Sequence, residues 1–69
     1  MARWTPVFSS PVRHRADIVS GVLGMHEVAA VLVDKTDSAY ASLGHYEVHV
    51  PSDDALRALR IIEQNIRFE

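Results

Sequence analysis

The chain has 69 residues, of which 48% are hydrophobic, with no cysteine and a formal net charge of −2 at pH 7. This length allows one domain with a thin stability margin, and the apolar content argues against disorder. The lack of cysteine excludes disulfides and thiolate metal sites, and the slightly acidic balance gives no general attraction to nucleic acid or anionic lipid. We therefore expect residues 1–69 to form one domain that binds no nucleic acid.

No segment has the pattern of a secretory signal or a membrane span. Residues 1–6 lack an apolar central region. The longest apolar run, residues 28–33, is far shorter than the roughly 18 residues that a spanning helix needs. Together with the lack of cysteine, these features predict a soluble cytoplasmic protein without membrane contact.

The first elements are a strand and a helix. Residues 4–8 predict a short strand at a sheet edge, because Pro6 cannot donate to a ladder. The Ser-Ser-Pro sequence at 9–11 predicts a helix start, where a hydroxyl meets free amides and proline lacks only an unused donor. Gly24 is the expected end, since glycine readily takes the left-handed conformation. The predicted buried stripe is Val12, Ala16, Val19 and Leu23, widened by Ile18 and Val22.

Two further strands are predicted in the middle of the chain. The continuous apolar run 28–33 indicates a strand covered on both faces or central in the sheet. A polar segment, 34–44, is longer than a tight hairpin needs. Residues 45–50 then alternate strictly, which is typical of a half-buried strand. The inward residues are Tyr46, Val48 and Val50, and the outward residues are His45, Glu47 and His49.

A second helix ends the pattern. Ser52 is the expected cap, and Asp53 and Asp54 lie where the helix dipole favours negative charge. The predicted buried stripe is Ala55, Leu59, Ile62 and Ile66, flanked by Leu56, Ala58 and Ile61.

This order predicts an α+β fold of β-α-β-β-α type, the ferredoxin-like split arrangement without its last strand. We expect a three-stranded antiparallel sheet with two helices on one face. The other face would carry Thr5 or Val7 together with His45, Glu47 and His49. Because this face is uncovered and open edges accept further strands, we expect a homo-oligomer or a protein partner on the sheet.

The outward trio His45, Glu47 and His49 is a candidate metal site. Positions i and i+2 on a strand are about 7 Å apart, so neighbouring side chains can share an ion. His45 and His49 would be about 13 Å apart, too far to share one ion at bonds of about 2 Å. The strand therefore offers one His–Glu pair, and a third ligand must come from elsewhere. The alternative is a solvated polar face.

The segment after the second strand is a candidate ligand site. Lys35, Asp37, Ser38 and Tyr40 combine a cation with hydroxyls and an aromatic ring, a composition that suits small anions or peptides. The alternative is a simple connection in which Tyr40 folds back as a hydrophobic plug. No Gly-rich phosphate loop and no cysteine nucleophile is present, so no cofactor and no catalytic residue is predicted.

The chain resembles the prokaryotic signal transducing protein family, a bacterial family of unknown function. The resemblance covers most of the chain and depends on the order and spacing of several short stretches, namely residues 7–11, 14–19, 35–40 with Leu43-Gly44, 46–50 and 53–59. It implies a compact domain related to the PII-type nitrogen-signalling proteins, which have a ferredoxin-like core, form trimers and bind nucleotides between subunits. Only the fold is carried over, because this chain is much shorter and has no room for their long partner-binding loop.

These observations together predict a non-catalytic regulatory or protein-interaction module rather than an enzyme. The alternative is a small-ligand or metal-sensing domain that uses residues 35–40 or the outward sheet face.

Overall fold

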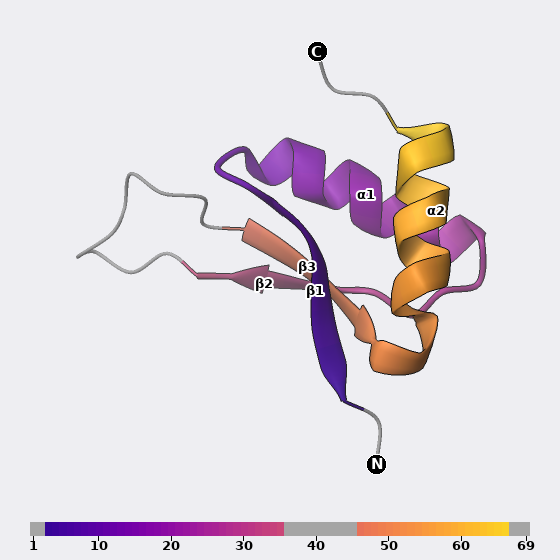
Figure 1. Cartoon of the computed structure of the whole chain (residues 1–69). Helices are drawn as coiled ribbons and strands as arrows, with labels where there is room; N and C mark the ends of the chain where they lie inside the picture. Colours follow the sequence, from indigo (N-terminus) through magenta and orange to yellow (C-terminus); the bar gives the residue numbers. More distant parts are fainter. Residues whose placement is uncertain (1–2, 36–45, 67–69) are drawn as a thin grey trace.

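The computed structural model describes residues 3–35 and 46–66 of the chain. Three strands and two α-helices make up the fold of the described residues, with a 3-10 helix before the second α-helix (Figure 1). In chain order they are β1 (Trp4–Ser10), α1 (Arg13–Met25), β2 (Val31–Asp34), β3 (Tyr46–Pro51), the short 3-10 helix η2 (Ser52–Asp54) and α2 (Ala55–Asn65). The predicted α+β order is confirmed.

The three strands form one sheet in the order β1-β3-β2, and β3 is antiparallel to both neighbours. β3 is therefore the central strand and β1 lies at an edge, as its proline predicts. The prediction that residues 28–33 form a strand covered on both faces or central in the sheet is wrong, because β2 is a four-residue edge strand that starts only at Val31, and Val31 is 45% exposed. Val28 is buried in the connection from α1, so its apolar character serves the core rather than the sheet.

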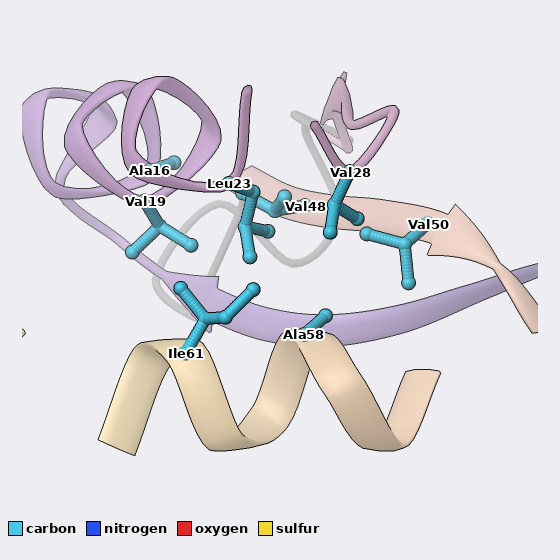
Figure 2. Packing of buried hydrophobic residues seen from close by; sticks show 8 residues of the cluster. All are labelled: Ala16, Val19, Leu23, Val28, Val48, Val50, Ala58 and Ile61. Carbon is cyan, nitrogen blue, oxygen red and sulfur yellow. The ribbon is translucent and has the colours of Figure 1, made fainter. Parts of the chain in front are cut away.

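Both helices pack on the sheet face that carries Val48 and Val50 (Figure 1). α1 contacts all three strands, whereas α2 contacts β1, β3 and α1. Figure 2 shows the buried side chains pointing toward one another from the helices, β3 and the connection after α1. The cluster consists of Ala16, Val19, Leu23, Val28, Val48, Val50, Ala58 and Ile61. This arrangement is consistent with a small ferredoxin-like fold.

An irregularity in β1 decides which of its side chains join the core. The pairing with β3 shifts between Pro6 and Phe8, so Val7 has no partner of its own. Thr5 lies opposite Val50 before the shift, and Phe8 lies opposite Val48 after it. Because one extra residue resets the alternation, Val7 and Phe8 both pack against the core.

The end of α1 differs from the prediction that Gly24 closes it. The helix continues to Met25, and the left-handed residue is Glu27, with a φ of 63°. The Val28 N–H donates to the Leu23 carbonyl at 2.9 Å, and the Glu27 N–H donates to the Gly24 carbonyl at 3.0 Å. These two bonds form a Schellman motif, and the buried Leu23 and Val28 are the apolar pair that accompanies it.

The serines at the helix starts act in two ways. Ser10 is buried, and its Oγ accepts the N–H of Val12, the N-cap residue, at 3.0 Å; α1 has no side-chain cap on its first amides, so the predicted hydroxyl cap is wrong. Ser52 caps no helix: it begins η2 and donates from Oγ to the Arg3 carbonyl at 2.9 Å. Since Ser52 has one hydroxyl proton, Thr5 is the donor in the 2.6 Å contact between Thr5 Oγ1 and Ser52 Oγ. Ser52 thus joins the start of β1 to the end of β3.

The buried side of α2 is rotated from the predicted one. Ala58 and Ile61 are buried, whereas Leu59 is 46% exposed and Leu56 is 74% exposed. Arg57 donates to the His26 carbonyl at 2.7 Å, which places α1 beside the flank that carries Arg57 and Ile61. Leu56 and Leu59 lie on the sides of α2 that are turned away from Ala58 and Ile61 and from the core. The prediction that Leu59 belongs to the central buried stripe is wrong for this reason.

Candidate functional site: the outer sheet face

The face of the sheet opposite the helices is uncovered in the described part of the chain, and we call it the outer sheet face. Cross-strand partners share a face, so the pairing gives its rows. One row is Pro6, His49 and Val31, and the next is Ser9, Glu47 and Val33, with Trp4 at the end of β1. Glu47 and His49 lie on this face, as their alternation with Val48 and Val50 predicts.

The β1 residues expected on this face are different ones. Thr5 pairs with Val50 and Val7 packs against the core, so both belong to the helix side. Trp4 and Pro6 take their places. The alternation of the sequence does place Trp4 and Pro6 on the same face of the strand. The register shift at Val7, which decides which face that is relative to Phe8, is not visible in the sequence.

An apolar hollow lies in the outer sheet face. It has a volume of about 320 Å³ and is lined by Trp4, Val31, Val33 and His49. Trp4 is 46% exposed and Val31 is 45% exposed. The hollow therefore offers apolar surface from both edge strands, with one polar ring, that of His49, from the central strand.

A charged cluster begins at His49, which also lines the hollow, and continues toward the end of β2. His49 donates from Nε2 to Glu47 Oε1 at 2.8 Å, and Lys35 Nζ lies 3.3 Å from the same oxygen. The side chains of Glu47 and His49 are only 20% and 19% exposed, whereas that of Lys35 is mostly in solvent. The hydrogen bond from His49, followed by the contacts with Lys35, holds the pKa of Glu47 below its usual value of 4.5 against the opposing effect of burial.

The structure divides the predicted metal and ligand sites. It brings Glu47 and His49 together, and adds Lys35, which was predicted as part of a separate ligand site. His45, Asp37, Ser38 and Tyr40 lie outside the described residues. Within the described residues no group of three or more histidine or acidic side chains is arranged to hold a metal ion.

The functional residues that sequence reasoning missed are the apolar ones: Trp4, Pro6, Val31 and Val33. The sequence predicts a strand at Val31 and Val33 but not the face on which each side chain lies, because a continuous apolar run has no alternation that distinguishes two faces. Only the pairing with His49 and Glu47 puts these two valines on the outer sheet face.

Neither described helix is long and apolar enough to cross a membrane. Comparisons of the chain with protein-family models, curated proteins and solved structures find no match.

Proposed function

We propose that this chain is a non-catalytic regulatory module, of the kind used in signal transduction, that binds a protein partner through its outer sheet face. The observation that carries the proposal is the exposure of Trp4 and Val31 around an apolar hollow on a sheet face that no described element covers. Exposed apolar surface bordered by charged residues is typical of interaction sites. Tryptophan is among the residues enriched at the energetic centre of interfaces.

The geometry around Glu47 and His49 supports a binding role better than a catalytic one. These two side chains are hydrogen-bonded to each other on the outer sheet face, beside a hollow that is open to solvent rather than enclosed. General acid–base catalysis is most effective in sites that exclude water. Lys35 and His49 both contact one carboxylate oxygen, so the charge of Glu47 is already compensated by the Lys35 ammonium.

The test compares the wild-type chain with Val31→Asp and with Met25→Asp. Met25 is the matched control, because it is an exposed apolar residue at the end of α1, away from the outer sheet face. We expect a partner captured from the native host, or a homodimer seen by light scattering, to be lost in Val31→Asp and kept in Met25→Asp. A monomer that captures the same proteins in all three forms would contradict the proposal.

A second candidate function is small-ligand sensing in the same hollow. The observation that favours it is the hollow's volume of about 320 Å³, which lies at the lower end of the range of roughly 300–1,000 Å³ for small-molecule sites. Trp4 is the only tryptophan in the chain, so its fluorescence reports binding directly. A panel of metals, nucleotides and amino acids that changes neither Trp4 emission nor thermal stability would remove this candidate.

A further inference from the structure

The dimensions of the outer sheet face limit the kind of partner that covers it. Three strands at about 4.8 Å spacing make a face about 14 Å wide, and six residues at about 3.4 Å make β3 about 20 Å long. The resulting plan area is about 280 Å², the footprint of a narrow face. One α-helix has a diameter of about 10–12 Å, so about 13 residues of a single helix would cover this face.

The edges of the sheet disfavour the other narrow partner, an added strand. Pro6 pairs with His49 but has no N–H to donate to β3. It therefore fits a position of the antiparallel ladder at which the backbone N and C=O point toward the free edge of β1. That edge therefore lacks a donor at Pro6 and is bent at Val7. The other edge strand, β2, has only four residues. Short, bulged and proline-containing edges are the features by which proteins avoid strand addition.

The outer sheet face has an apolar hollow and one exposed positive charge, that of Lys35, next to each other. The hollow between Trp4, Val31 and Val33 accepts a large apolar side chain. At the charged end Glu47 is largely covered, whereas the Lys35 ammonium is the exposed charge. An acidic residue on the partner therefore complements this end.

We propose that the partner docks one amphipathic helix on the outer sheet face, with an apolar side chain in the hollow and an acidic residue at Lys35. The inference rests on the proposed function and specifies the class of partner. It makes the bound molecule a three-layer assembly of helices, sheet and partner helix. Helix-in-groove docking uses apolar residues at i, i+3, i+4 and i+7, which predicts the sequence pattern of the partner segment.

The experiment uses three capped peptides of about 14 residues without tryptophan. The first has leucines at helical spacing and glutamates in its last turn. The second has the same composition with alternating leucines, and the third has lysines in place of the glutamates. Trp4 emission is recorded as each peptide is added to the full chain, up to about 1 mM.

We expect the first peptide to shift Trp4 emission to the blue, and Val31→Asp to weaken its binding about tenfold or more. The third peptide should bind about two- to fivefold more weakly. Lys35→Glu, a change at an exposed position, should reverse this preference and select the third peptide over the first. This reversal depends on no core residue, so it tests the docking even if Val31→Asp unfolds the chain.

Three results would overturn the inference: no emission change with the first peptide, an equal change with the alternating peptide, or the same peptide preference in Lys35→Glu. These results leave the proposed function itself untouched, because partner capture tests it independently. If Val31→Asp abolishes partner capture while the first peptide does not bind, the outer sheet face is an interaction site for a partner without such a helix.

Discussion

Glu27 occupies a backbone conformation that usually belongs to glycine. Its φ of 63° is the left-handed conformation at the end of α1, which costs a residue with a Cβ roughly 1–2 kcal/mol. The two Schellman hydrogen bonds and the burial of Leu23 against Val28 hold it there. This conformational cost belongs to Glu27 alone, so a substitution at Glu27 can remove it without changing a core residue.

Glu27→Gly should raise the free energy of unfolding by about 1 kcal/mol, measured by urea denaturation. Glu27→Ala keeps the Cβ and should give no comparable gain. Gly24→Ala should also stabilise, by up to about 1 kcal/mol, because Gly24 lies within the helix and a Cβ there meets no atom within 4 Å. Destabilisation by Gly24→Ala would instead show that Gly24 closes the helix.

Glu47 makes stability depend on acid pH. Its pKa is lowered in the folded chain, chiefly by the hydrogen bond from His49, so folding favours the charged carboxylate. The stabilising contribution is therefore complete above the unfolded value of 4.5 and is lost as the pH falls through the lower folded pKa.

Glu47→Gln should make the free energy of unfolding fall less steeply below pH 4.5, as measured by denaturation at a series of pH values. His49→Gln should flatten the same region, because it removes the largest cause of the lowered pKa of Glu47. A wild-type slope in Glu47→Gln would show that this carboxylate does not contribute.

At the scale of elements, α2 shows how packing selects part of a wide apolar surface. Its apolar residues extend from Ile61 round to Leu56, which is more than one packing surface can cover. α1 lies beside Arg57, and the sheet lies below Ala58. Leu56 and Leu59 are 74% and 46% exposed, so their side of α2 lies outside the core of the described residues.

Ile61→Ala should therefore destabilise the chain by about 2–4 kcal/mol, because it leaves a cavity in the core. Leu59→Ala should cost less than about 1 kcal/mol, and Leu56→Ala less still. Thermal unfolding of the three variants distinguishes this orientation of α2 from the predicted one, in which Leu59 would be the costly position.

At the scale of the whole molecule, the edges of the sheet and its outer face have opposite properties. Both edges are unsuited to strand addition, β1 through Pro6 and its bulge and β2 through its length. The outer sheet face instead has apolar residues in the open. These properties suit the proposed association through the outer sheet face, where side chains provide specificity, better than association through backbone edges, where any strand could pair.

Pro6→Ala should increase non-specific association, because it restores a backbone donor to the free edge of β1. Light scattering at high protein concentration should rise slowly with time relative to the wild type. Pro11→Ala is the control, since Pro11 lies between β1 and α1. Equal scattering from all three chains would argue against protection of this edge by Pro6.

The order and type of the three strands and two α-helices could be predicted from local patterns, whereas the 3-10 helix η2 could not. Helical spacing identified Ala16, Val19 and Leu23 as the buried side of α1, but it was wrong for Val12 and Ile18, which are exposed. Strict alternation identified Val48 and Val50 against Glu47 and His49. These are local periodicities, and each depends only on residues within one element. The antiparallel sheet with helices on one face followed from the order.

Only the tertiary structure decided which strand is central, how α2 is rotated and which residues make the outer sheet face. The position of β2 at an edge could not be predicted from the run 28–33, because a uniformly apolar stretch does not indicate which of its residues pair or which face is covered. Leu59 is exposed because α2 packs through Ala58 and Ile61 instead. Trp4 lies on the outer sheet face with Val31 because of the strand pairing and the register shift at Val7. Each of these features depends on residues far apart in the chain, and so on contacts that no local pattern encodes.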